Sequence, residues 1–153
     1  MPIKYEIAYD LQKDLNEIAL LLFPHVKLDS VSVIRSHGSS SRGTIARCHA
    51  LGKAMMLGMQ RKHSFYVIEV ISKRFDKLSE INKIKTLIHE LMHIPYTFGG
   101  GFKHHDYVTE ENVEKEYQKY INLKEKSGEK IEEVDKFKNN KEDKPIITKI
   151  KWW

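Results

Sequence analysis

The sequence predicts an α+β fold, in which a small mixed or antiparallel sheet of three to four strands carries one helix packed on it and flanking helices around it. Three observations support this prediction. Helical periodicity occurs near the start and again in the second half of the chain, with strand-like runs between. The strand-like runs follow one another at hairpin spacing and do not alternate with helices as in a βαβ array. A length of 153 residues fits a single hydrophobic core.

The first half of the chain predicts one helix and three strands. Residues 10–23 place apolar side chains at helical spacing, and Pro24 ends the pattern. Residues 31–34 form a short β-branched run, and residues 44–51 alternate small and larger side chains as a half-buried strand does. Residues 65–71 are the strongest predicted strand, because they are rich in aromatic and β-branched residues.

Two further helices are expected in the second half. Residues 79–96 form an amphipathic pattern that begins with Ser79 as a plausible N-cap and approaches Pro95 at its end. The glycines 99–101 then turn the chain, and residues 109–123 repeat apolar side chains along one side of a helix.

Composition changes after this last helix. In residues 124–144 about two residues in three are charged, which is typical of a linker or a solvated helix. Residues 145–153 alternate as a closing strand would. We therefore expect a minimal domain over residues 1–123, a charged segment over 124–144 and a strand-like tail over 145–153.

Charge and cysteine content limit the compartment and the partners. The net charge of +5 permits a weak nucleic-acid association but does not require one, because lysines are interspersed with acidic residues. Cys48 is the only cysteine, so the chain forms no internal disulfide and no cysteine-rich zinc site. The N-terminus lacks a secretion signal, and the longest apolar run, residues 18–23, is too short for a membrane span. We expect a cytoplasmic protein without membrane contact.

The predicted helix 79–96 carries the pattern His89-Glu90-x-x-His93. At about 100° per residue, His93 lies only about 40° around the helix from His89 and one turn along it, so both imidazoles face one point. Glu90 lies beside the pair without crowding it. Two neutral imidazoles bind Zn²⁺ in zinc peptidases that carry this pattern, and the glutamate accepts a proton from the attacking water.

A catalytic zinc site requires a third protein ligand and one open position. The residue six positions after His93 is Gly99 instead of histidine, which excludes the metzincin spacing. His104 and His105 follow the glycine turn, which allows the chain to reverse toward the metal. A carboxylate ligand is the alternative, from Glu111 or Glu114 on the next predicted helix.

Residues 36–120 resemble the SprT-like zincin superfamily, and look most similar to its compact archaeal and phage metallopeptidases. The resemblance rests on four stretches: Phe65-Tyr-Val-Ile-Glu-Val-Ile-Ser, Phe75-Asp-Lys-Leu-Ser79, Leu87-Ile-His-Glu-Leu-Met-His-Ile-Pro95, and Thr97-Phe98-Gly-Gly-Gly101 with a trailing histidine. It implies a zincin-like fold and favours His105 as the third zinc ligand. The chain has no cysteine-rich zinc ribbon of the kind that links larger members to DNA.

The sequence thus predicts a zinc metallopeptidase that cleaves protein or peptide substrates, with Glu90 as general base and His89, His93 and His105 as zinc ligands. The alternative is a non-proteolytic, metal-stabilised protein that contacts nucleic acid through a basic surface. Strand 65–71 is the expected edge for an extended substrate, unless it is simply core. Tyr96 and Tyr107 can donate to an oxyanion, although ordinary packing is the simpler expectation.

Overall fold

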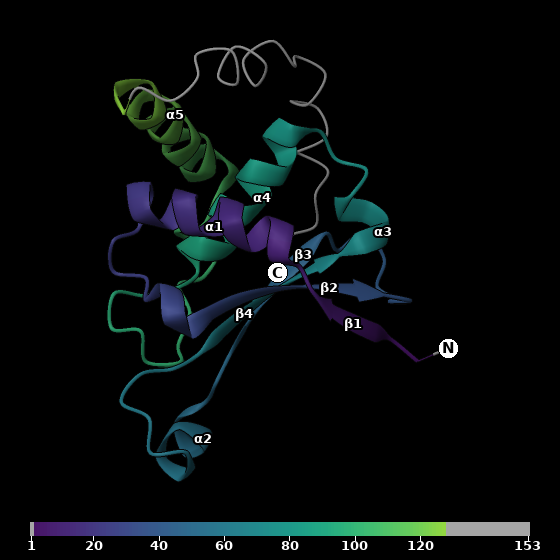
Figure 1. Ribbon diagram of the computed structural model, residues 1–153, viewed down its shortest axis with the longest axis vertical. Helices are drawn as coiled ribbons and strands as arrows, with labels where there is room; N and C mark the ends of the chain where they lie inside the picture. Colours follow the sequence, from purple (N-terminus) through teal and green to yellow (C-terminus); the bar gives the residue numbers. More distant parts are fainter. Residues whose placement is uncertain (1, 128–153) are drawn as a thin grey trace.

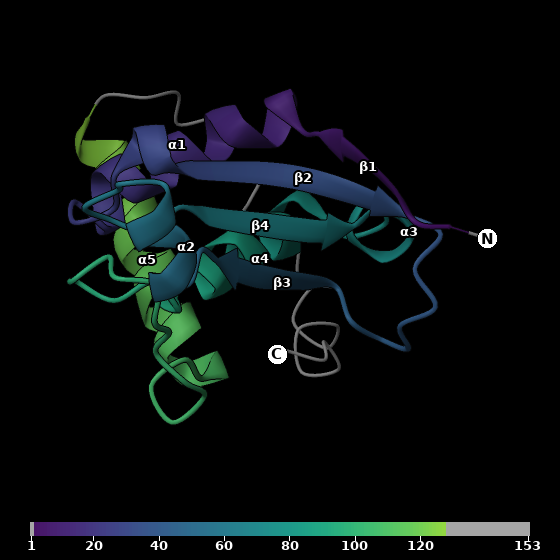
Figure 2. The ribbon, with the colours of Figure 1, turned by 90° about the horizontal axis from the view of Figure 1, so that it is seen from below.

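A four-stranded mixed sheet forms one layer of the protein, two long helices cover one of its faces, and a third long helix packs on those two (Figures 1 and 2). The computed structural model describes residues 2–127. The predicted tail 145–153 lies wholly outside the described residues, and so does the predicted charged segment beyond residue 127. The α+β prediction is confirmed, and the sheet has the larger of the two strand numbers expected.

The sheet has the strand order β1-β2-β4-β3. Strands β2 and β4 pair in parallel, whereas β1 pairs with β2 and β3 pairs with β4 in antiparallel fashion. The strands are β1 (Lys4–Ile7), β2 (Val31–His37), β3 (Ala46–Ala50) and β4 (Tyr66–Ile71). In Figure 2 they lie side by side in this order, with the helices behind them.

Two long helices form the layer on the sheet, a third packs on them, and three short helices lie in the connections. The long helices are α1 (Tyr9–Leu22), α4 (Glu80–Met92) and α5 (Glu110–Lys126). The short ones are η1 (Leu28–Ser30), α2 (Lys53–Gly58) and α3 (Ser72–Phe75). None of the helices in the described part of the chain has the length and apolar character needed to cross a bilayer.

The core is built from the periodic residues that predicted the helices. Helix α1 buries the five apolar residues of its inner face, and its most deeply buried side chains, Leu15 and Ile18, are 0 % exposed. Burial of each such side chain contributes about 1.5–3 kcal/mol. The sheet supplies the facing layer, with Val33, Ile68 and Val70 also fully buried. The small residues of β3, Ala46 and Cys48, lie buried as the alternation predicts, which leaves room for α4 above them.

Four short elements were not predicted, and some boundaries differ from expectation. These elements, β1, η1, α2 and α3, bury few or no side chains and therefore carry little hydrophobic periodicity. Strand β2 runs three residues further than predicted, and α5 continues to Lys126. Helix α4 ends at Met92 instead of near Tyr96. Its last amides, from His93 and Ile94, bond to carbonyls three residues back, which tightens the final turn before Pro95.

The sequence allows two interpretations of strand 65–71, an edge for an extended substrate or an ordinary core strand, and the structure supports the second. Strand β4 is paired on both sides, with β2 and with β3. Its backbone groups are therefore used within the sheet. Among the described residues, β3 is the edge strand on the side next to α4.

Candidate metal centre

Helix α4 begins as the sequence predicts and carries the His-Glu-x-x-His pattern to its C-terminal end. The Ser79 side chain accepts a hydrogen bond from the Asn82 amide at 3.3 Å, which caps the helix. The three residues of this pattern are buried and do not line an open cleft: His89 and Glu90 are 0 % exposed, and His93 is 4 % exposed. The helix thus delivers these polar groups into an interior, where each of them needs a partner.

Three histidines converge at this point. One ring nitrogen from each of His89, His93 and His105 lies within 4.8 Å of the other two. The Nε2 atoms of His89 and His93 are 3.2 Å apart. Two nitrogens bound at about 2.0–2.1 Å around a tetrahedral ion are separated by about 3.3–3.4 Å. The helical pair is therefore already spaced for one ion. His105 is exposed, and its ligand nitrogen lies within 4.8 Å of those of the other two histidines.

The other candidates for the third ligand lie elsewhere. His104 is exposed and is not part of the cluster. Glu114 is bound to the Lys85 ammonium, with Oε2 at 2.6 Å from Nζ. Glu111 is on the solvent side of α5, where it pairs with Lys115 at 3.5 Å. Of the residues weighed from the sequence, the structure brings together His89, His93 and His105.

The orientation of His93 is fixed from outside the cluster. Its Nδ1 donates a hydrogen bond to the Lys103 carbonyl oxygen at 2.6 Å, because a carbonyl can only accept. The proton is thereby held on Nδ1, and the Nε2 lone pair faces the cluster. Burial, followed by the neighbouring His93 and His105, lowers the pKa of His89 to about 2. Burial also lowers the pKa of His93. Both imidazoles are therefore neutral near pH 7, as metal ligands must be.

Glu90 is a buried carboxyl group without an evident partner. Within residues 2–127, neither of its carboxylate oxygens forms a hydrogen bond. Burial raises the pKa of Glu90 well above its ordinary value. Burial, and secondly the charge of Glu90, also raise the pKa of the Cys48 thiol. A nearby cation is the usual compensation for such a group, so the donor set and the orphaned carboxylate together fit a divalent metal.

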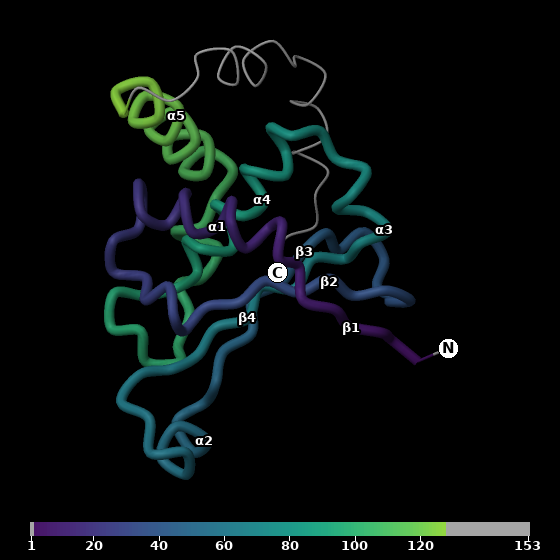
Figure 3. Tube along the Cα trace, in the orientation of Figure 1, coloured from purple at the N-terminus to yellow at the C-terminus, as the bar shows by residue number. Residues whose placement is uncertain are grey.

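The loop from α4 to α5 follows the path drawn in Figure 3. It brings His105 to the cluster, and the Tyr66 hydroxyl of β4 holds it by two hydrogen bonds. The Tyr66 hydroxyl accepts a hydrogen bond from the Gly100 amide at 3.0 Å and donates one to the Gly101 carbonyl at 2.8 Å. Gly100 has φ +94°, and a Cβ at this position would lie 2.7 Å from the Leu51 carbonyl oxygen. The close approach therefore requires glycine.

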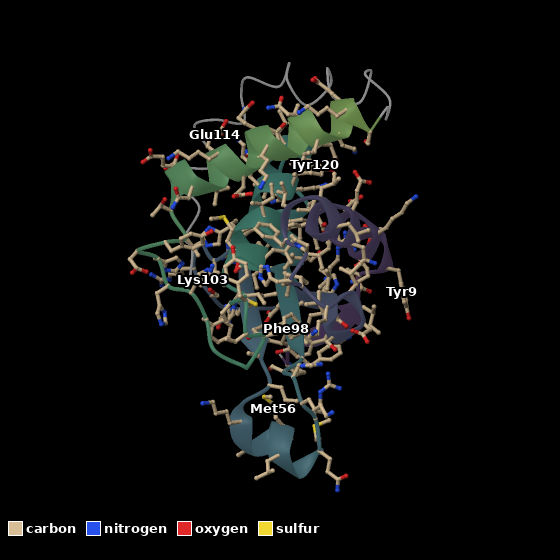
Figure 4. The ribbon with its side chains drawn as sticks, turned by 90° about the vertical axis from the view of Figure 1, so that its left-hand side faces the viewer. Tyr9, Met56, Phe98, Lys103, Glu114 and Tyr120 are labelled. Carbon is tan, nitrogen blue, oxygen red and sulfur yellow. The ribbon has the colours of Figure 1, made fainter. Side chains whose placement is uncertain are left out.

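Tyr96 and Tyr107, the candidates for oxyanion donation, both pack on Lys103. The Lys103 ammonium lies 4.4 Å from the centre of each ring, an arrangement that favours cation–π attraction. In the described part of the chain, neither hydroxyl is hydrogen-bonded to the three histidines. Their observed role is packing around the loop, the simpler of the two expectations. Figure 4 labels Lys103 on this loop, apart from α5 and its Glu114.

Two contributors to this site were missed from the sequence. The Lys103 carbonyl orients His93, and the Tyr66 hydroxyl anchors the glycine turn. A backbone carbonyl leaves no trace in the residue type. Tyr66 reads as an ordinary strand residue, and its partner Gly100 is 34 residues away in the chain. The only local signal is the run of three glycines, which indicates a close approach without naming its partner.

The family comparison agrees with this geometry. Residues 3–137 match the model of a family described as "Putative phage metallopeptidase". The chain belongs to this family. Membership in this phage metallopeptidase family, together with the histidine cluster, supports a metal ion at the site and a protein or peptide as substrate. Comparison with curated proteins and with solved structures gave no match.

Proposed function

We propose that this chain is a zinc-dependent metallopeptidase of the SprT-like zincin type, which hydrolyses peptide bonds in protein or peptide substrates. The observation that carries the proposal is that one nitrogen each from His89, His93 and His105 converge within 4.8 Å of one another, beside the unpartnered Glu90 of α4. Three imidazole nitrogens favour Zn²⁺ over Ca²⁺ and Mg²⁺, which prefer oxygen ligands. The single cysteine fits a reducing compartment such as the cytoplasm.

The number of ligands favours a catalytic over a structural site. Structural zinc sites are usually closed by four protein ligands, commonly including cysteine. Among residues 2–127, three histidines converge, which would leave one position of a tetrahedral site open, and Cys48 lies buried in β3 outside the cluster. Because His105 is exposed while His89 and His93 are buried, the open side of the site is the side toward solvent.

Each residue has a distinct role in the proposed reaction. His89, His93 and His105 would hold the metal, and the hydrogen bond to the Lys103 carbonyl would keep the His93 ring oriented toward it. When bound, the metal supplies Lewis-acid chemistry, polarising the scissile carbonyl and acidifying a water molecule. Glu90 would take the proton from the attacking water and pass it to the leaving amine. Its burial excludes bulk water, which strengthens its interactions with the reacting groups.

Strand β3 offers the backbone groups for an extended substrate. The Leu51 amide bonds to the Phe65 carbonyl at 2.9 Å and the Ile71 amide to the Ile45 carbonyl at 2.8 Å, so the odd-numbered residues of this ladder face β4. The amides and carbonyls of the alternate residues, Ala46, Cys48 and Ala50, therefore point away from the sheet. A polypeptide added at this edge would lie beside α4 and its cluster.

The proposal is tested by linking metal content to hydrolysis. The purified protein should contain about one zinc per chain and should cleave casein. A chelator should remove both together, and added Zn²⁺ should restore both. Hydrolysis that persists after the zinc is gone would refute the metal mechanism. A fully zinc-loaded protein that binds nucleic acid but cleaves no peptide would favour the non-proteolytic alternative, to which the family match gives no support.

A further inference from the structure

Helix α2 projects from the body of the protein as an apolar protrusion. It connects β3 to β4 and stands on the side of the sheet opposite to the long helices (Figures 1 and 2). None of its residues is buried, although it contains several large apolar side chains. Met55 is 57 % exposed, Leu57 is 81 % exposed, and Met59, directly after the helix, is 55 % exposed. Figure 4 shows Met56 on this protrusion, well away from Phe98 and the helix layer.

The protrusion lies in a segment with a one-sided charge. Residues 30–68 contain six lysines and arginines and no aspartate or glutamate, so this segment carries +6 whereas the whole chain carries only +5. Lys53 and Lys62 flank the apolar side chains and are exposed. Within residues 2–127, neither of them forms an ion pair. We call Lys53, Met55, Leu57, Met59 and Lys62 the α2 tip.

The α2 tip is held in place by its stem. The Arg61 guanidinium donates to the Ser30 hydroxyl at 3.1 Å and to the His63 carbonyl at 3.2 Å. The Ser64 hydroxyl donates to the Leu51 carbonyl at 2.7 Å and closes the base of the protrusion. These hydrogen bonds fix the base of the protrusion, so the α2 tip is held in one position before a partner binds.

The stem is also continuous with the proposed active site. Strand β3, which is the edge strand next to α4 among the described residues, leads into α2 through Leu51 and Gly52. The Leu51 carbonyl contacts Gly100 of the loop that carries His105, and the Ser64 amide bonds to the Phe98 carbonyl of that loop at 2.9 Å. A chain laid along the outer edge of β3 and extended past its end would therefore reach the α2 tip.

From these observations we propose that the α2 tip captures extended polypeptide substrates that carry acidic and apolar side chains, and feeds them along β3. This inference rests on the proposed peptidase function. The lysines complement acidic residues, and flexible methionine side chains adapt to irregular apolar partners. A nucleic acid fits the tip less well. The three large apolar side chains of the tip are aliphatic, so they offer no aromatic ring on which bases stack, and a strand edge pairs with polypeptide backbone.

The test separates capture from catalysis by measuring binding in an inactive background. In zinc-loaded Glu90→Gln protein, fluorescence anisotropy with labelled casein gives a Kd that does not depend on hydrolysis. Combined Met55→Gln, Leu57→Gln and Met59→Gln changes keep helix-forming residues. They should weaken casein binding about tenfold or more. Lys53→Glu with Lys62→Glu should weaken it similarly, and most strongly at low ionic strength.

The matched controls lie on α1. Leu20→Gln removes an apolar side chain that is 68 % exposed, and Lys13→Glu reverses an exposed lysine, both outside the α2 tip. These variants should bind casein as the Glu90→Gln parent does. In the active background, the α2 variants should raise KM for casein while zinc content and cleavage of a short peptide stay unchanged.

The outcomes distinguish this inference from the proposed function. Casein binding that is unchanged in both α2 variants overturns capture by the tip. So does a loss of binding to single-stranded DNA with casein binding retained, which would assign the tip to nucleic acid. Casein binding that depends on the tip, in a zinc-loaded protein that hydrolyses nothing, would support capture while refuting the peptidase.

Discussion

His93 and Lys103 are joined by a reciprocal pair of hydrogen bonds. The imidazole Nδ1 donates to the Lys103 carbonyl at 2.6 Å, and the Lys103 amide donates to the His93 carbonyl at 2.8 Å. The end of α4 is thereby tied to the loop that carries His105 only two residues further on. Two proposed ligands are thus positioned by one short backbone connection, and this suggests which changes should affect metal and which should affect catalysis.

Replacement of Glu90 by glutamine should keep the fold and the zinc but remove hydrolysis. A glutamine side chain has similar shape but cannot accept the proton, a loss of about 10²–10⁴-fold in rate. Metal analysis and a casein assay on the purified variant measure the two effects. Glu111→Gln, on the solvent face of α5, is the control and should remain active. A Glu90→Gln protein as active as wild type would show that the assigned mechanism is wrong.

His105→Ala should weaken zinc binding by more than about 100-fold, whereas His104→Ala should change it little. The reason is that only His105 reaches the cluster. Competition with a chromophoric chelator gives both affinities. If the two variants retain zinc equally and Glu114→Ala or Glu111→Ala loses it, the site belongs to the carboxylate-ligand class.

Tyr66→Phe should reduce zinc affinity about 10- to 100-fold through the loop it anchors. The variant removes the two hydrogen bonds to Gly100 and Gly101 but keeps the ring that packs on Phe98. Tyr120→Phe is a matched control, because it deletes a hydroxyl that bonds to Glu17 at 2.9 Å on another part of the fold. Both variants should lose about 1 kcal/mol of stability. Equal zinc affinities in the two variants would show that Tyr66 stabilises the fold without supporting zinc binding.

Asp10→Asn should destabilise the protein at pH 7 and should do so less at pH 2. The Arg35 guanidinium, first through its hydrogen bonds to Asp10 at 2.7 and 2.9 Å, lowers the pKa of that carboxyl below its usual 3.8. The stabilisation is therefore present above pH 3.8 and is lost as the pH falls through the lower folded-state pKa. Because Asp10 is largely exposed, the effect should be only about 0.5–1 kcal/mol. Urea unfolding at both pH values measures it, and an equal loss at both would contradict the ion pair.

A Gly/Ser linker in place of residues 128–144 should leave bound zinc and casein cleavage intact. The sequence places the start of the dispensable segment at Lys124, but α5 continues to Lys126, and the Lys124 ammonium lies 2.8 Å from Glu17. We therefore start the replacement after α5. Loss of zinc or solubility in the linker protein would assign the segment to the folded domain. Loss of cleavage with zinc retained would indicate a role in substrate capture.

The sequence by itself determined the parts of the site that depend on local geometry. The spacing of His89 and His93 places two imidazoles on one face of any α-helix, and Ser79 marks where that helix begins. The apolar character of residues 66–71 likewise predicts a buried strand. In each case the relevant neighbours lie within a few residues along the chain. The regular geometry of a helix or a strand is therefore enough to predict their positions from the sequence.

Only the tertiary structure decided which distant groups meet. It placed β4 at the centre of the sheet and β3 at the edge, an order that hydrophobic patterns do not encode because they report burial and not the neighbouring strand. It brought His105, and not His104, to the helical pair, because the Tyr66 hydroxyl and the Lys103 carbonyl fix the path of the intervening loop. These contacts join residues 10 to 35 positions apart, and their free energy depends on a packed core that no short stretch of sequence contains.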